Sequence, residues 1–416
     1  MLLGAGLAAI SLTLVDTSTA AVHSLPTGSE VAFDLSTTPS ARLAFSFGTS
    51  ELGFGYSPSF AWLDVTRGGQ LALLHSASAS YSYSARRLRL TLDVSGSYGK
   101  QSFLGLAGSR TPVSPPVDDG GVPAGGVPAP ADPNGAPALP DAGQSASGDL
   151  ALLPQQAVVE TGSVAGSFSL GYTLSQRWDL GAQAGYTVSG GLGESKDSLP
   201  LRRGPNGTLS ATFRVTRRDT LTSAATGTYS YVPSLKSRFL TLGLLETWGH
   251  RFGERTFGSV GGGATYLRSR TAEQPDPENS ILASGLISFN QGYLLPDRAI
   301  LTWSLNGTLG TGYNQVLGVV NQSATGSAGV TWSRDRLTLG ANGQVTQTLP
   351  IDVPSTSFVY GAGGAASYQV LEVLSLQAGG SWSHQLLPNV DVDSSVNLDQ
   401  WQAYVAFTLG APVLTL

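Results

Sequence analysis

The sequence predicts an all-β protein, an antiparallel transmembrane β-barrel of about 16 strands, with roughly 14–18 possible. Short charged turns recur along the chain 36 to 43 residues apart. Between consecutive turns the chain alternates apolar and polar residues, passes through a longer loop and alternates again. Each strand of ~11–16 residues exceeds the 9–11 needed to cross a tilted barrel wall. The turns centre on Arg177, Arg218, Glu254, Asp297, Asp335 and Glu372.

The composition agrees with a barrel and excludes several other classes. Charged residues make up 12% of the 416 residues, about half the usual share, and 53 residues are Gly. A mean hydropathy of +0.05 excludes a bundle of membrane helices. The absence of Cys excludes a disulfide framework and a thiolate metal site. A net charge of −5 argues against nucleic acid as a partner.

The N-terminal segment reads as a targeting sequence. Residues 1–15 form an apolar run that is too short for a membrane helix and suits the core of a signal peptide. Small residues at Ser18 and Ala20 offer a cleavage site, so we expect residues 1–20 to be a signal peptide. No Lys or Arg precedes Arg42, so we expect the natural N-terminus to lie upstream. The alternative is that the run forms a buried strand or helix.

Residues 21–40 are polar and are expected to form an N-terminal extension, with the barrel spanning residues 41–416. The alternation is clearest from Val164 to Leu174, where a period of two places the two residue sets on opposite faces of a strand. Residues 41–48 either add a strand or form a short inner hairpin. The expected strands are near 51–61, 71–84, 87–99, 157–174, 177–190, 207–216, 219–232, 238–253, 255–269, 280–294, 298–312, 320–333, 336–348, 356–369, 373–384 and 398–410.

Three features favour a membrane barrel over a soluble β-sandwich. The strands are longer than the usual five or six residues. Short turns alternate with longer loops. Tryptophans gather near both strand ends, as at the two lipid–water interfaces of a membrane barrel. The interface set is Trp62, Trp178, Trp248, Trp332, Trp382 and Trp401.

One loop differs from the rest. Residues 104–155 are rich in Pro, Gly and Ala, which cannot bury a core, so this loop is expected to be disordered. By strand parity it lies on the long-loop side. We favour a solvated surface loop over a constriction folded into the lumen.

The hairpin train, the two tryptophan belts and the final amphipathic strand resemble Gram-negative outer-membrane β-barrel proteins across about residues 41–416. The final strand resembles the carboxy-terminal assembly signal of that class, with Tyr404, Phe407 and Leu409 near alternating positions. It departs from the class by continuing to Leu416 and not ending in Phe. The resemblance implies a location in the outer membrane, with outer-membrane lipid and the barrel assembly machinery as partners.

No catalytic, cofactor or metal site is expected. Hydrolases of this architecture need a His placed by its neighbours, and the chain has only four His. His384 beside Ser383 is the best candidate for an outer-membrane lipid hydrolase, an alternative that we rank last. Asp391 with Asp393 lacks the dense oxygen ligand set of a Ca²⁺ site.

The polar strand face predicts the function. It is rich in Ser, Thr, Gly, Gln and Asn and carries few charges, which suits passage of hydrophilic, largely neutral solutes through a porin-like channel. Polysaccharide export with periplasmic partners is a specific extension. The alternative is a structural or surface-display barrel without transport. The residues expected to line the pore are Arg89, Asp93, Asp179, Gln183, Arg214, Asn306, Asn342, Gln344, Gln402 and Tyr404.

Overall fold

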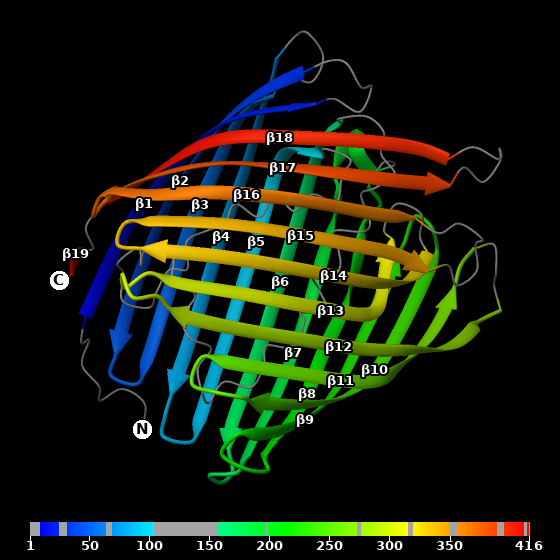
Figure 1. The fold of residues 1–416 in the computed structure, drawn as a ribbon. Helices are drawn as coiled ribbons and strands as arrows, with labels where there is room; N and C mark the ends of the chain where they lie inside the picture. The colour runs from blue at the N-terminus through cyan, green and yellow to red at the C-terminus, as the bar shows by residue number, and fades with distance from the viewer. Residues whose placement is uncertain are drawn as a thin grey trace.

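A computed structural model describes residues 9–24, 31–63, 69–103, 157–196, 199–272, 276–314, 319–349, 357–388, 395–411 and 414–415. They form a closed antiparallel barrel in which nearly every strand pairs with its neighbours in the sequence (Figure 1). Within these residues, no helix is long and apolar enough to cross a membrane. The loop expected to be disordered, residues 104–155, lies outside the described residues.

Eighteen strands build the wall, and the two-residue strand β19 (Leu414–Thr415) adds a short pairing to β1. The wall strands are β1 (Ala9–Ser24), β2 (Val31–Phe47), β3 (Ser50–Leu63), β4 (Gln70–Ser84), β5 (Leu88–Phe103), β6 (Ala157–Thr173), β7 (Trp178–Gly191), β8 (Arg202–Arg214), β9 (Asp219–Val232), β10 (Ser237–Arg251), β11 (Thr256–Arg270), β12 (Glu278–Leu294), β13 (Ile300–Asn314), β14 (Val319–Arg334), β15 (Leu337–Leu349), β16 (Phe358–Leu371), β17 (Leu374–Pro388) and β18 (Ser395–Gly410). The predicted fold class is confirmed, and each of the sixteen expected strands has its counterpart.

The N-terminal segment is a strand of the barrel in the structure, and its cleavage as a signal peptide stays a prediction. Strand β1 pairs with β2 from Ala9↔Ser46 to Ser24↔Val31, and with β18 from Val15↔Gly410 to His23↔Gln402. The structure therefore places residues 9–24 in the strand that closes the barrel, where a signal peptide at 1–20 was expected. Strand β2 likewise replaces most of the polar extension expected at 21–40.

The physical reason is visible in the alternation of these two strands. Ile10, Leu12 and Leu14 share one face of β1, while Ser11 and Thr13 share the other. A run of apolar and small residues is compatible with both a signal-peptide core and a strand, and the strand is the alternative that the sequence analysis left open. The closing partner, β18, lies almost 400 residues away in sequence and gives no local signal.

The two ends of the barrel differ. At one end, here called the turn end, consecutive strands join through two to five residues, from 335–336 to 295–299. At the other, the loop end, the connections run from four residues to the 53 of 104–156. All six predicted turns lie at the turn end, as do the start of β1 and the end of β18. This asymmetry is typical of outer-membrane barrels.

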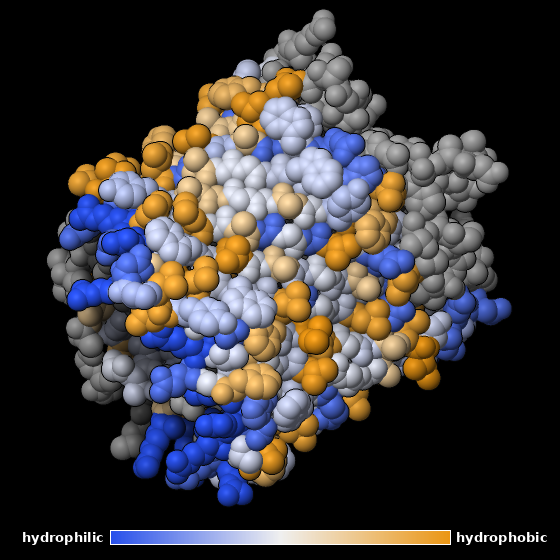
Figure 2. All heavy atoms as spheres, viewed as in Figure 1, coloured by the Kyte–Doolittle hydropathy of each residue, from blue (hydrophilic) through white to orange (hydrophobic). Residues whose placement is uncertain are grey.

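The two faces of each strand also differ. On β8, Leu209 is 63% exposed, and on β6 Val164 is 58% exposed, although both are large and apolar. Exposed apolar side chains of this kind cover the outward face, which Figure 2 shows as scattered orange over β10–β18. The inward face takes the alternate residues, so each strand carries its polar set into the barrel.

Two places interrupt the wall. Pro39 and Pro58 face each other across β2 and β3, where pairing stops between Thr37↔Phe60 and Ala41↔Tyr56. Neither proline has an N–H to donate. The gap is crossed by side chains, with the Thr38 hydroxyl donating to Ser59 Oγ at 3.2 Å.

The second interruption is a seam between β12 and β13. Their pairing begins at Gly285↔Leu309 and runs to the turn end. Residues 278–284 therefore pair only with β11, and residues 310–314 pair only with β14. Gln322 Nε2 of β14 crosses the seam to the carbonyl oxygen of Ala283 at 2.6 Å. The loop-end half of this seam lacks the backbone ladder found elsewhere.

The outward assignment of β8 predicts a sharp contrast between two neighbouring positions. Leu209→Arg would place a charge in lipid near the middle of the membrane and should lower the unfolding free energy by about 2–4 kcal/mol. Thr208→Arg, on the inward face, should change it far less. Denaturant unfolding of both variants in lipid vesicles measures the difference. Equal losses would contradict the face assignment.

The seam predicts a difference in cross-linking, in a chain that has no native Cys. Ile287→Cys with Gly307→Cys joins two opposed outward positions in the paired half and should oxidise readily. Ala283→Cys with Thr311→Cys occupies the equivalent positions across the seam and should oxidise at least tenfold more slowly. Non-reducing electrophoresis after protease cleavage between the strands follows both pairs. Equal rates would show that the two strands are paired along their full length.

Candidate functional site

All ten residues that the sequence analysis assigned to the pore lie on inward strand faces. Gln183 and Asn342 are exposed there, while Asn306 and Gln344 are half-buried. Gln402 and Tyr404 share the inward face of β18, and Tyr404 Oη accepts a hydrogen bond from Gln377 Nε2 of β17 at 3.0 Å. That these residues line a conducting pore stays a prediction, because position on the inner face does not establish passage.

The charged side chains of the interior lie mainly on one wall. In the turn-end half of the described strands, six of the seven charged inward side chains lie on β2–β8. Arg251 on β10 is the seventh. The six are Arg42, Glu51, Arg89, Asp93, Asp179 and Arg214.

Two ion pairs balance part of this wall. Arg214 Nη2 lies 2.9 Å from Asp179 Oδ2, and both side chains are about one-third exposed. Thr173 also donates to Asp179 at 2.9 Å, which fixes the carboxylate. Arg42 and Glu51 form a longer, more exposed contact of 3.4 Å. Exposed pairs of this kind contribute little stability, so their main effect here is on the field inside the barrel.

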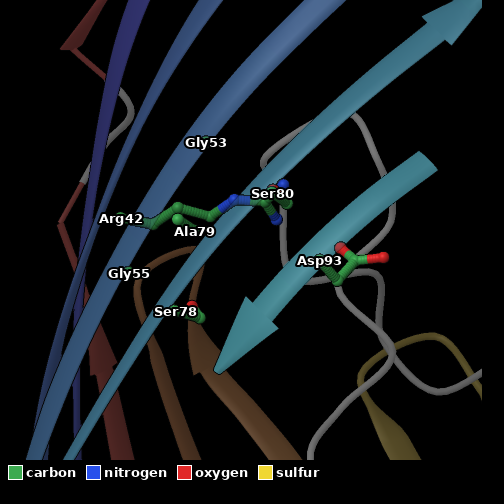
Figure 3. A pocket seen from close by; sticks show the side chains of 7 residues that line it. All are labelled: Arg42, Gly53, Gly55, Ser78, Ala79, Ser80 and Asp93. Atoms are coloured by element: carbon green, nitrogen blue, oxygen red, sulfur yellow. The ribbon is translucent and has the colours of Figure 1, made fainter. Parts of the chain in front are cut away.

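A recess of about 310 Å³ opens on this wall between β2 and β5. Figure 3 shows the Arg42 side chain extending past Gly53 toward Ser80, with Asp93 on a neighbouring strand. Ser78 lies below them beside Gly55. The recess therefore combines one cation, one carboxylate and two hydroxyls, which are the groups that hydrogen-bond a polyhydroxylated solute.

Glycine makes room for these hydroxyls. A Cβ at Gly53 would lie 2.8 Å from Ser80 Oγ, and a Cβ at Gly55 would lie 2.7 Å from Ser78 Oγ. The registers Gly53↔Ser80 and Gly55↔Ser78 place each glycine opposite its serine. The same pairing recurs at Gly181↔Ser210 on the inner face of β7 and β8. Part of the high glycine content thus serves to keep the inner wall thin and hydroxylated.

The opposite wall is neutral. Between β11 and β18 its inward residues in the turn-end half are mostly Ser, Thr, Asn, Gln and Gly. Ser259 and Ser288 hydrogen-bond each other at 2.8 Å across β11 and β12. A hydrated molecule inside the barrel would therefore meet charge on one side and hydroxyl or amide groups on the other.

The interior of the loop end is closely packed. Many inward residues there are almost fully buried, including Ala32 at 1% and Gln385 at 0%. Val232, Phe239 and Leu267, on three successive strands, form an apolar cluster inside the wall. The interior is thus exposed toward the turn end and buried toward the loop end.

The hydrolase alternative gains no support from the geometry. His384 accompanies Trp382 on the outward face of β17, where its Nδ1 lies 2.7 Å from Asp399 Oδ1. Ser383 points inward, because successive strand residues alternate between faces. Among the described residues, no group of three or more His, Cys, Asp or Glu could hold a metal ion. Asp391 and Asp393 lie outside the described residues.

The six tryptophans of the predicted interface set all share the outward face. Trp178 and Trp248 lie toward the turn end and are 41% and 46% exposed, while Trp62 and Trp401 lie toward the loop end. Trp332 is half-buried and Trp382 lies opposite Trp401. Contact with the lipid interface itself stays a prediction.

Sequence reasoning missed Arg42 and Glu51 as interior residues. Residues 41–48 were left as either a further strand or a short inner hairpin, so the face of Arg42 was not assigned. Alternation through β2 would have found it, since Arg42 shares its face with Ala32 and Asp34. The outward carboxylates Asp16 and Glu246, which hydrogen-bond Thr37 and Ser223, were also unforeseen.

Comparison with solved structures returns outer-membrane barrels at low identity. OccK2 (OpdF) of Pseudomonas aeruginosa is 12% identical, with 97% of this chain and 98% of that chain covered and a TM-score of 0.45. The copper transporter OprC is 9% identical, with 95% and 80% covered and a TM-score of 0.45. The ferric citrate transporter FecA is 11% identical, with 96% and 78% covered and a TM-score of 0.45.

Comparison with curated proteins finds no match. A family model does match, over residues 8–300, and its description is the EpsX exopolysaccharide export family. The match begins just before β1, so it includes the two strands that the sequence analysis had placed outside the barrel. It covers more than half of the chain and runs through the whole charged wall. The chain therefore belongs to the EpsX exopolysaccharide export family.

Proposed function

We propose that this protein forms a passage for exopolysaccharide across the outer membrane, with its turn end in the periplasm and its loop end outside the cell. The observation that carries the proposal is the composition of the inner face, hydroxyl and amide groups with charges confined mainly to one wall. Hydroxyl and amide groups can hydrogen-bond sugars. Because these groups carry no charge, they give the interior little ion selectivity. Membership of the EpsX exopolysaccharide export family supports the same proposal.

The size of the barrel supports passage of a polymer. Strands ~4.8 Å apart and tilted ~40° give the 18-stranded wall a backbone diameter of about 36 Å. Barrels of 16–18 strands are wide enough for an aqueous channel, whereas eight strands are filled by side chains. This diameter is about three times the ~10–12 Å width of an α-helix with its side chains, so the wall has room for a polymer strand.

The close packing of the loop end favours a passage that is gated. Because Gln385, Val232 and their neighbours are buried, a polymer leaving at the loop end would have to displace the groups that cover them. We therefore propose a gated passage, opened by the export process and its periplasmic partners. The same packing favours the second candidate, a structural or display barrel that does not conduct.

Planar-bilayer recording separates the two candidates. The refolded protein should give large, weakly ion-selective steps, either as the full chain or as a variant that lacks residues 104–155. Neutral polymers of graded size should then block up to a defined cutoff. Silence from a folded barrel in both forms would favour the display role. Loss of surface glycan on gene deletion would link the conductance to export, and unchanged glycan would count against export.

The charged wall predicts a shift in ion selectivity. Asp93→Asn removes an interior carboxylate that makes no ion pair among the described residues, so the reversal potential in a KCl gradient should move toward that of Cl⁻. Glu246→Gln removes the same charge from the outward face and serves as the matched control. Equal shifts in both variants would show that the Asp93 wall does not face the conducting path.

A further inference from the structure

Arginines gather at the turn end. Six consecutive connections, from β4–β5 round to β14–β15, each carry at least one Arg in the turn itself. Together these six turns hold eight Arg and three acidic residues, although the chain as a whole has a net charge of −5. We call these eight residues the arginine arc. They are Arg86, Arg87, Arg177, Arg217, Arg218, Arg255, Arg298 and Arg336.

The arginine arc is exposed and mostly unengaged. All eight residues are exposed, and none forms an ion pair within the described part of the chain. Two of the three acids in the turns are held by a different residue, since Arg334 lies 3.1 Å from Asp297 and 3.7 Å from Asp335. Hydrophilic side chains crowd the left and lower-left edge of Figure 2, where Figure 1 places several of these turns.

The positive charge continues into the barrel. Arg89 and Arg251 occupy inward positions within a few residues of the turns, and neither makes an ion pair among the described residues. Arg214 lies at the same height, paired with Asp179. A ligand that followed these guanidinium groups would pass from the exposed rim to Arg89 and Arg251, the first inward arginines, before it reached Asp93 farther along β5.

The presence of arginines on both the rim and the inner wall distinguishes between three classes of anionic ligand. Lipid phosphates could pair with the arc but could not reach Arg89 or Arg251 on the inner face. An acidic protein surface would also meet the rim alone. A flexible polyanion could contact both, because one strand of it can thread the mouth. Guanidinium binds carboxylate in bidentate fashion, and a ring of like charges concentrates oppositely charged ligands at a mouth.

We propose that the arginine arc is the entry site for an acidic polysaccharide, one whose repeats carry carboxylate or another anionic group. The proposal rests on the proposed function and adds the chemical class of the cargo. Arc and inner arginines draw the chain in by its charges, and the hydroxylated wall then holds it by its sugars.

The test is blocking of the conducting barrel by two oligosaccharides of equal size. Polygalacturonate oligomers serve as the acidic probe and dextran oligomers as the neutral one, both added from the turn end in zwitterionic lipid at low salt. The acidic probe should block with an on-rate at least tenfold higher, and the preference should shrink as salt rises. Equal on-rates would overturn the proposal.

The variants test the site. Replacing Arg86, Arg87, Arg217 and Arg218 by Gln should abolish most of the preference while dextran still blocks. Arg268→Gln with Arg270→Gln removes exposed outward arginines at the loop end and should leave the preference intact. A preference that survives the fourfold variant would overturn the assignment to the arc.

A second measurement keeps the two proposals separable. Binding of polygalacturonate to the barrel in nanodiscs requires no conductance, so it tests the arc even if the barrel never conducts. Binding that depends on the arc and on Arg89 and Arg251 supports an acidic cargo. The contrary result is binding that depends on the arc and is unchanged in the double variant Arg89→Gln with Arg251→Gln. That result would mean that acidic macromolecules only dock on the rim, and it would overturn the proposal that the arc is an entry site.

Discussion

Closure of the backbone hydrogen-bond ladder is the constraint on which the structure depends. A β-sheet that crosses hydrocarbon finds no partner there for an N–H or a C=O, so such a wall must pair its own polar groups in a closed ring. The pairing of β1 with β18 meets this requirement by joining the two ends of the chain. Where the ladder fails, at Pro39 and Pro58, side-chain hydroxyls supply hydrogen bonds in its place.

Closure also fixes which residues face outward and which face the interior. Because side chains alternate between the two faces of a strand, Leu209 of β8 points outward and Thr208 points inward. The same alternation is repeated on every strand around the barrel. The interior can therefore be polar only because the exterior is apolar. Glycines opposite serines refine this arrangement, since Gly53 and Gly55 leave space for the hydroxyls of Ser80 and Ser78.

The two ends of the barrel differ in charge and in packing. Short turns bring arginines together at one mouth, and the interior near this mouth is exposed. At the other mouth many inward residues are buried, and Val232, Phe239 and Leu267 form an apolar cluster on three neighbouring strands. The seam between β12 and β13 lies in this same half, so the loop end is both the most packed part of the interior and the least regular part of the wall.

The sequence by itself determined the fold class, the sixteen strands from β3 to β18 and the face of each predicted pore residue, because alternation and turn chemistry are local signals. It could not assign residues 9–47, since apolar runs with small residues suit a signal peptide and a strand equally well. Only the tertiary structure decided that β1 meets β18, that Arg42 meets Glu51 beside Asp93, and that arginines from six separate turns share one mouth. These juxtapositions depend on ring closure and on register across strands, and neither is encoded within any single stretch of the chain.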